Sequence, residues 1–131
     1  MDDSGKYLIL LVDDDGNFRE VIKTKLEAAG FAVAEAVNGE EGFEKTKQLK
    51  PNLVFMDVQM PKMNGIECLS KIKADPEITA TKVIFLTNYG EENSADKTLD
   101  DKFAKDIGAL GHMRKTDDLD KMIQRVKQEL R

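Results

Sequence analysis

Acidic side chains directly follow two apolar runs of the chain: Asp13 and Asp14 follow the first run, and Asp57 follows the third. Thr87 ends the fourth run, and Lys115 follows the fifth. Clustered carboxylates repel one another unless a cation lies between them, and oxygen ligands with open positions suit Mg²⁺ beside a phosphate. A hydroxyl and an ammonium can hold phosphoryl oxygens, and a carboxylate can accept a phosphoryl group. These residue types indicate phosphoryl transfer, with Asp57 as the best-placed acceptor.

The apolar runs alternate with segments of helical periodicity. The runs are Lys6–Val12, Phe31–Ala36, Leu53–Met56, Lys82–Thr87 and the weaker Leu110–Arg114. Helices are expected over 18–29, 39–48, 65–74 and 119–130, and from about Asp96 after a polar, acidic loop. Continuous apolar strands that alternate with helices predict a parallel sheet covered on both faces. Since sites in such sheets form at the carboxyl ends of the strands, the residues above are expected to converge there.

Local features refine these elements. Val21 belongs to the apolar stripe of the first helix, and Gly30 lies where a left-handed C-cap is expected. Phe43 is expected to point inward from the second helix, and Thr116 or Asp117 can cap the last helix.

The chain resembles the receiver domain of two-component response regulators over about residues 7–126. The best-matching stretches are ILLVDDD (Ile9–Asp15), LVFMDVQMPKMNGIE (Leu53–Glu67) and VIFLT (Val83–Thr87). The resemblance is to the chemotaxis-type, single-domain class, and residues 1–131 are expected to form one receiver domain. It implies an α/β fold of the flavodoxin-like, doubly wound type, with a five-stranded parallel sheet in the order 2-1-3-4-5 and five helices.

The resemblance also implies roles for the acidic residues. Asp57 matches the phosphoacceptor, Asp14 the direct metal ligand, and Asp13 a ligand acting through water, while the backbone carbonyl of Gln59 supplies a further ligand. The expected metal is Mg²⁺, for which Mn²⁺ can substitute. A histidine kinase or a histidine phosphotransfer protein is the expected phosphoryl donor. The domain is then a phosphoacceptor switch that promotes its own phosphorylation and slow autodephosphorylation, rather than an enzyme.

Thr87 and Lys115 match the hydroxyl and the lysine that contact the phosphoryl group, and Thr87 with His112 matches the conformational switch. Three departures stand out. Thr116 follows Lys115 where the family usually has a cis-proline, and a cis bond before another residue costs about 3 kcal/mol. Whether the Lys115–Thr116 bond is cis or trans, and where the Lys115 side chain points, therefore stay open. His112 replaces the usual Tyr or Phe. The interval from Thr87 to Lys115 is longer than usual, which predicts an insertion after the fourth strand.

His112 leaves two hypotheses open. It fills the switch position as a small aromatic, or its charge state biases the switch, since imidazole titrates near pH ~6.5. The output face is expected to be formed by the fourth helix, fifth strand and fifth helix, and the kinase is expected near the first helix. Whether the chain acts alone or is part of a longer regulator stays open.

Composition narrows the function classes. Twenty Lys and Arg against 25 Asp and Glu give a net charge of −5 with interleaved signs, which disfavours direct nucleic-acid binding. No run approaches the ~20 apolar residues of a membrane span, and the start lacks a signal-peptide layout. The single cysteine, Cys68, excludes an internal disulfide, and a cytoplasmic location is expected.

Two rival functions remain. A pseudo-receiver would use the same fold as a phosphorylation-independent protein-binding module, and Thr116 and His112 motivate it. A phosphohydrolase with Asp-x-Asp after the first strand would use Asp13 and Asp15, but it leaves Asp57 without a role. Phosphorylation by a small donor separates the switch from the pseudo-receiver, and turnover of phosphate esters identifies the hydrolase.

Overall fold

The computed structural model describes residues 5–87 and 101–130, and within them β-strands alternate with α-helices along the chain. The strands are β1 (Leu8–Val12), β2 (Ala32–Ala36), β3 (Leu53–Asp57), β4 (Val83–Thr87) and β5 (Gly111–Arg114). The helices are α1 (Gly16–Ala28), α2 (Gly39–Leu49), α3 (Gly65–Ala74), α4 (Asp101–Asp106) and α5 (Leu119–Glu129). The predicted strands and the helices predicted over 18–29, 39–48, 65–74 and 119–130 are therefore confirmed, with shifts of one or two residues at most boundaries.

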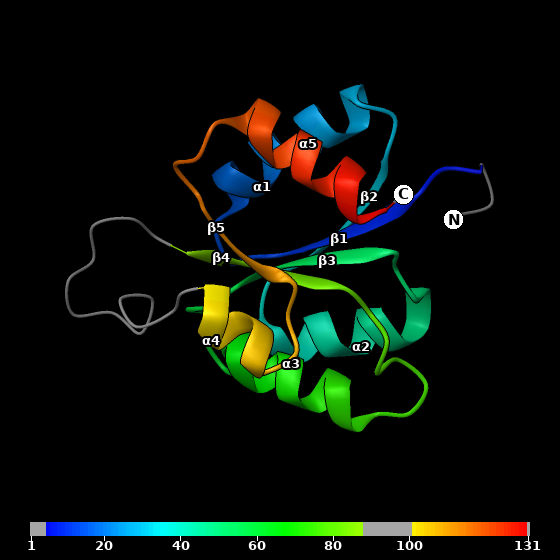
Figure 1. Ribbon diagram of the computed structural model, residues 1–131, viewed down its shortest axis with the longest axis vertical. Coiled ribbons are helices and arrows are strands. Elements are labelled where there is room, and N and C mark those ends of the chain that lie inside the picture. Colours follow the sequence, from blue (N-terminus) through cyan, green and yellow to red (C-terminus); the bar gives the residue numbers. More distant parts are fainter. Residues whose placement is uncertain (1–4, 88–100, 131) are drawn as a thin grey trace.

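All five strands pair in parallel, in the order β2-β1-β3-β4-β5, as predicted. Each crossover between neighbouring parallel strands passes through a helix, which covers one face of the sheet. Helices α1 and α5 lie on one face, and α2, α3 and α4 lie on the other (Figure 1). The result is a three-layer α/β fold of the doubly wound type.

Alternate residues of the central strands supply two hydrophobic cores. Leu10, Val54, Met56, Val83 and Phe85 pack with Cys68, Leu69 and Ile72 of α3. Ile9, Leu11, Phe55, Ile84 and Leu86 pack with α1 and α5, chiefly through Ile22, Leu26, Met122 and Val126. Because both faces of β3 and β4 are buried, their sequences are continuous apolar runs rather than alternating ones.

Three local expectations need correction or refinement. Val21 is 51% exposed, because α1 meets the sheet through Ile22 and the preceding residue lies about 100° further round the helix. Phe43 is half-buried beside the core, rather than enclosed by it. The N-cap of α5 is Asp118, neither Thr116 nor Asp117.

The N-cap of α5 moves because Asp117 has another task. Its Oδ2 accepts the backbone N–H of Arg114 at 2.9 Å, and its own N–H donates to the carbonyl of Arg114, also at 2.9 Å. Asp118 is then free to accept the N–H of Asp120 at 2.8 Å. The predicted C-cap glycine, Gly30, has φ +97°, which is the left-handed conformation that favours glycine.

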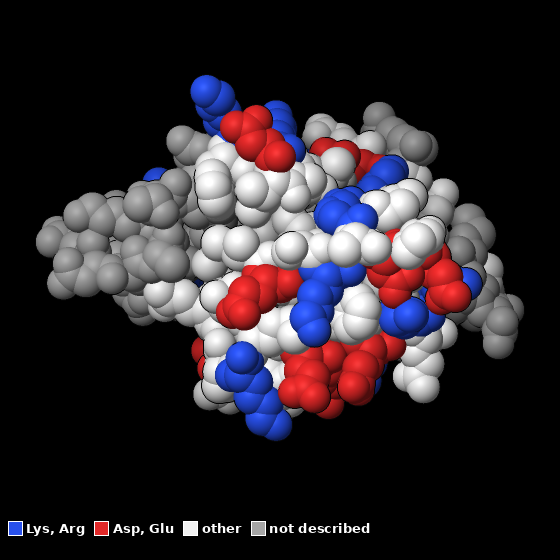
Figure 2. Space-filling view, turned by 90° about the horizontal axis from the view of Figure 1, so that it is seen from below, with Lys and Arg blue, Asp and Glu red and all other residues white. Residues whose placement is uncertain are grey.

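Helix α4 is described from Asp101 to Asp106, so the expected start near Asp96 and the expected insertion after β4 fall on residues outside the described part. Within α4, Ala104 is buried against the core, while Phe103 is 40% exposed. The face seen in Figure 2 carries acidic and basic side chains next to one another. Across residues 5–87 and 101–130, no helix is long and apolar enough to cross a membrane.

Candidate functional site

The strand register brings the predicted residues to one edge of the sheet. Val12 pairs with Met56, so Asp13 leaves β1 beside the point where Asp57 ends β3. Asp57 pairs with Leu86, which precedes Thr87 on β4. Thr87 in turn lies opposite Arg114, and its carbonyl accepts the N–H of Lys115 at 2.9 Å. Four residues far apart in the sequence therefore meet at the carboxyl ends of neighbouring strands.

Three carboxylates form a cluster that could hold a metal ion. One oxygen each from Asp13, Asp14 and Asp57 lies within 4.8 Å of the others, with Asp13 and Asp57 buried and Asp14 exposed. Oδ1 of Asp13 accepts the N–H of Asp15 at 2.9 Å, and Oδ2 is buried with the ammonium of Lys115 as its ion-pair partner at 2.8 Å. Three carboxylates this close together, two of them buried, repel one another and fit a divalent cation with oxygen ligands.

Asp57 lies in an unusual electrostatic setting. Burial and the neighbouring charge of Asp13 raise the pKa of Asp57 to about 7, against the opposing effect of Lys115. The backbone N–H of Gln59 donates to Oδ1 of Asp57 at 3.3 Å, which places the Gln59 backbone next to the acceptor. A bound cation would favour the ionised form of the Asp57 carboxyl and offset the repulsion between the clustered carboxylates.

Lys115 bridges two of the carboxylates. Its Nζ lies 2.8 Å from Oδ2 of Asp13 and 3.3 Å from Oδ2 of Asp57, and its side chain is 12% exposed. Burial lowers the pKa of Lys115, but the two carboxylates outweigh burial and the pKa is raised above its ordinary value. The ring of Phe18 also lies 5.1 Å from Nζ, at cation–π distance.

Lys115 reaches the site although Thr116, rather than a proline, follows it in the sequence. Cis peptide bonds are absent from the described residues, so the bond between Lys115 and Thr116, which the sequence left open, is trans. The bond from the Lys115 N–H to Thr87 and the turn closed by Asp117 hold this loop instead. The Lys115 side chain, whose direction the sequence left open, therefore points at the acidic cluster.

The two predicted switch residues both contact neighbouring elements. Thr87 is buried, and its hydroxyl donates to the carbonyl of Met113 on β5 at 3.5 Å, a long and weak hydrogen bond. The Nδ1 of His112 lies 2.8 Å from Oδ1 of Asp101 on α4, and the His112 backbone N–H donates to the same oxygen at 3.0 Å. Hydrogen bonding from this backbone N–H lowers the pKa of Asp101.

The third acid of the DDD run is a structural residue. Oδ1 of Asp15 accepts the N–H groups of Asn17 and Phe18 and caps the N-terminus of α1. A role for Asp15 in an Asp-x-Asp hydrolase site would require it to leave this cap. Arg19, Phe18 and Asp101 were not among the predicted site residues, because their contacts join separate elements and leave no periodic signal in the sequence.

Comparisons with known proteins agree with this arrangement. The model of the response regulator receiver domain matches residues 9–127. The chain is 43% identical over 86 residues to the chemotaxis protein CheY of Thermotoga maritima, covering 64% of this chain and 69% of that protein. It is 32% identical over 122 residues to sporulation initiation phosphotransferase F of Bacillus subtilis, covering 93% and 92% respectively.

Other relatives are longer. The chain is 37% identical over 119 residues to the transcriptional regulatory protein CrdR of Helicobacter pylori, and it spans 53% of that protein's length. It spans about half the length of several such relatives. Among solved structures, a CheY-like receiver domain protein from Methanospirillum hungatei superposes with a TM-score of 0.82 at 28% identity, covering 96% of this chain and 94% of the other. With this fold, and with acidic, threonine and lysine side chains meeting at one edge of the sheet, the chain belongs to the response regulator receiver domain family.

Proposed function

We propose that residues 1–131 act as one receiver domain that accepts a phosphoryl group on Asp57 and thereby switches a protein-binding surface. The observation that carries the proposal is the position of Lys115, whose ammonium contacts both Asp13 and Asp57 beside a three-carboxylate cluster. This arrangement gives one carboxylate a cation site on one side and a fixed positive charge on the other. Such a carboxylate can approach a phosphoryl group that would otherwise repel it.

The proposed reaction uses Asp57 as nucleophile. A carboxylate oxygen of Asp57 attacks the phosphorus of a phosphohistidine, a P–O bond forms, and the P–N bond breaks with its electron pair leaving on the imidazole. The donor is a histidine kinase or a histidine phosphotransfer protein. Slow attack by water on the phosphorus later returns Asp57 to its free state, so the domain is a switch rather than an enzyme acting on an outside substrate.

The metal site is assigned to Asp13, Asp14, Asp57 and the backbone carbonyl of Gln59, with Mg²⁺ as the cation and Mn²⁺ able to replace it. The bound cation offsets the combined negative charge of carboxylate and phosphoryl group. Lys115 is already at the site and neutralises a transferred oxygen. The long Thr87–Met113 hydrogen bond is weak, so breaking it costs little free energy and Thr87 can turn toward the phosphoryl group.

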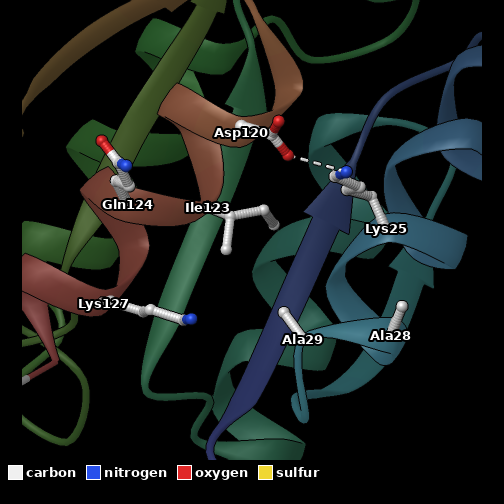
Figure 3. Close-up of a pocket in the computed structure, with 7 residues that line it drawn as sticks. All are labelled: Lys25, Ala28, Ala29, Asp120, Ile123, Gln124 and Lys127. Atoms are coloured by element: carbon white, nitrogen blue, oxygen red, sulfur yellow. Dashed lines mark ion pairs between the residues drawn. The ribbon is translucent and has the colours of Figure 1, made fainter.

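The donor is expected to dock on α1, next to the site. Val21 is half-exposed on this helix, in a largely apolar groove of about 430 Å³ that is also lined by Ala28 and Leu119. Figure 3 shows the adjoining groove between α1 and α5, where Lys25 and Asp120 form an ion pair at 2.7 Å. An apolar surface flanked by charges is typical of a protein-docking site.

The downstream target is expected on the face of α4, β5 and α5, to which Thr87 is joined through Met113. The interleaved charges disfavour direct contact with nucleic acid. We expect the protein to act in the cytoplasm, where the Cys68 thiol stays reduced. Burial raises the pKa of this thiol to about 12 and makes it unreactive.

Intact-mass measurement with acetyl phosphate and Mg²⁺ tests the proposal. The wild-type chain is expected to gain one phosphoryl mass, and the gain should vanish with EDTA or in Asp57→Asn. Asp15→Asn is the matched control, since it changes an acid of the same run that only caps α1, and asparagine preserves the cap. Failure of the wild-type chain to be modified would favour the pseudo-receiver instead. Equal modification of Asp57→Asn would remove Asp57 as the acceptor.

A further inference from the structure

The backbone of Asp13 is held at both of its polar groups. Asp13 stands just past the end of β1, and its N–H still donates to the carbonyl of Ala36 on β2 at 3.1 Å. Its carbonyl accepts a short hydrogen bond of 2.7 Å from Nη1 of Arg19. A residue at the end of a strand has no further ladder partner for its carbonyl, so this side chain takes the place of one.

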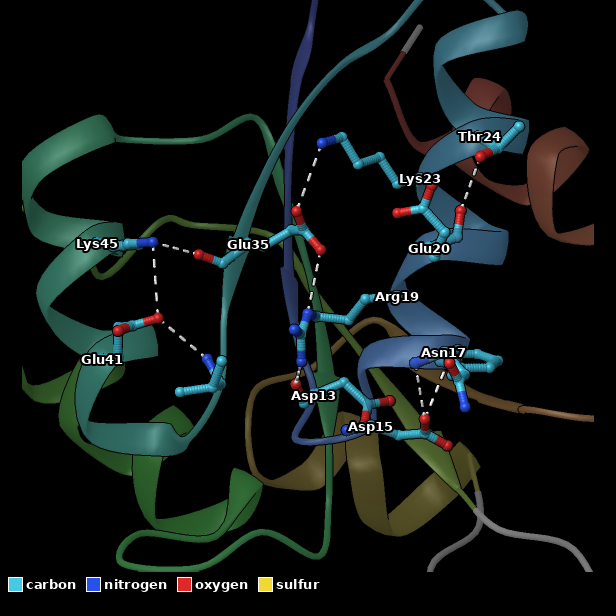
Figure 4. A network of polar contacts seen from close by, with 12 residues as sticks. Asp13, Asp15, Asn17, Arg19, Glu20, Lys23, Thr24, Glu35, Glu41 and Lys45 are labelled. Atoms are coloured by element: carbon cyan, nitrogen blue, oxygen red, sulfur yellow. Dashed lines mark hydrogen bonds and ion pairs between the residues drawn. The ribbon is translucent and has the colours of Figure 1, made fainter.

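Arg19 is itself fixed between α1 and β2. It lies on the second turn of α1, its side chain is only 17% exposed, and its Nε lies 3.1 Å from Oε1 of Glu35. The other oxygen of Glu35 lies 3.5 Å from Nζ of Lys23, and Lys45 donates to the Glu35 carbonyl. Figure 4 shows the guanidinium of Arg19 reaching from α1 between Glu35 and Asp13.

The charge of Arg19 is matched by Glu35, not by the Asp13 carboxylate. That carboxylate accepts the Asp15 N–H with Oδ1 and presents Oδ2 to the acidic cluster and to Lys115. Arg19 therefore acts on Asp13 through its carbonyl and adds no second positive charge to the carboxylate that Lys115 already contacts.

We propose that Arg19 is a positioning residue for the metal site: with Glu35 as its anchor, it fixes the Asp13 backbone and so holds the Asp13 carboxylate in the acidic cluster. The proposal rests on the proposed function of the same acidic cluster. Partners that orient metal ligands typically affect metal affinity by 10-fold or more. The rigid fork of arginine suits this task because Nη1 and Nε bond two different groups at once.

Calorimetric titration of the metal-free protein with Mg²⁺ tests this role. Arg19→Gln is expected to weaken Mg²⁺ binding roughly 10-fold. Lys23→Gln is the matched control, because Lys23 pairs with the same glutamate from the same helix but at its other oxygen, and its Mg²⁺ affinity should stay near that of the wild type. Arg19→Lys, which keeps the charge but loses the fork, should weaken binding as well and serves if Arg19→Gln fails to fold.

A double-mutant cycle separates positioning from general stability. If Glu35 acts through Arg19, then Glu35→Gln should weaken Mg²⁺ binding in the wild-type background and add nothing in the Arg19→Gln background. The proposal is overturned if Arg19→Gln lowers the melting temperature in EDTA while its Mg²⁺ affinity equals that of the wild type. A wild-type chain that binds no Mg²⁺ would instead contradict the proposed function, so the two failures are distinct.

Discussion

The raised pKa of Asp57 makes a prediction about stability at the scale of one residue. The folded carboxyl titrates at about 7, above the unfolded value near ~3.9, so between these values the folded state binds more protons than the unfolded state. The stability of the metal-free protein should therefore fall as pH rises from about 4 to 7. Asp57→Asn removes this cost and should be more stable than the wild type above pH ~7, by an amount on the order of 1–3 kcal/mol.

Urea unfolding in EDTA at a series of pH values measures this difference. The advantage of Asp57→Asn should shrink toward pH ~4, where the unfolded carboxyl begins to protonate as well. Lys115 keeps a partner in the variant, because it also contacts Asp13. A stability difference that is independent of pH would contradict a raised pKa at Asp57.

The contact between Phe18 and Lys115 predicts a second effect at this scale. Phe18→Leu keeps apolar volume but removes the ring face below the ammonium, an interaction that contributes about 0.5–1 kcal/mol at partly exposed sites. The initial rate of phosphorylation by acetyl phosphate should fall roughly 2- to 5-fold, while Phe18→Tyr, which keeps the ring, should stay near the wild type. Equal rates in Phe18→Leu and the wild type would show that the ring does not help position Lys115.

At the scale of elements, the sequence predicted what periodicity and turn chemistry determine. Continuous apolar runs located β3 and β4 within a residue, and Gly30 marked the end of α1. The order of strands came from the family resemblance. The cap of α5 was predicted wrongly, because Asp117 is taken by the Arg114 N–H and only the folded loop reveals that competition.

Close approach between elements was also beyond sequence reasoning. Gly65 begins α3, and a Cβ at this position would lie 2.2 Å from the backbone carbonyl oxygen of Asp57. The glycine in the matched MPKMNG stretch is thus required by the contact between the start of α3 and the end of β3, rather than by a turn with positive φ. The sequence shows the glycine, but it does not show that the Asp57 carbonyl lies too close to allow a side chain there.

The docking of α4 on β5 depends on one carboxylate and gives a prediction for that element. Asp101 accepts both the backbone N–H and Nδ1 of His112, so Asp101→Ala leaves two donors without this partner. The variant should lose about 0.5–2 kcal/mol of stability and show faster hydrogen exchange at the His112 amide. Asp106→Ala, at the exposed far end of α4, is the control and should leave this amide unchanged.

The same pair bears on the hypothesis that the charge of His112 biases the switch. Asp101 has a lowered pKa, so its charge persists through the range in which an imidazole titrates, and a protonated His112 would be held more firmly to α4. The hypothesis itself stays a prediction. Unchanged exchange at the His112 amide in Asp101→Ala would remove the structural basis for it.

For the whole molecule, occupancy of the proposed metal site should affect global stability, because strand pairing in the folded sheet brings its carboxylates together. A ligand bound only by the folded state stabilises it by about 2.7 kcal/mol at a hundredfold excess over Kd. Mg²⁺ should therefore raise the urea midpoint of the wild type, EDTA should reverse the rise, and Asp13→Asn should largely abolish it.

Because a cation and a proton compete for Asp57, whose metal-free pKa is about 7, Mg²⁺ should bind more weakly at pH 6 than at pH 8. Calorimetry at the two pH values, in buffers of different ionisation enthalpy, measures both the affinity and the protons released; equal affinity with no proton release would contradict the assignment of Asp57 to the metal site.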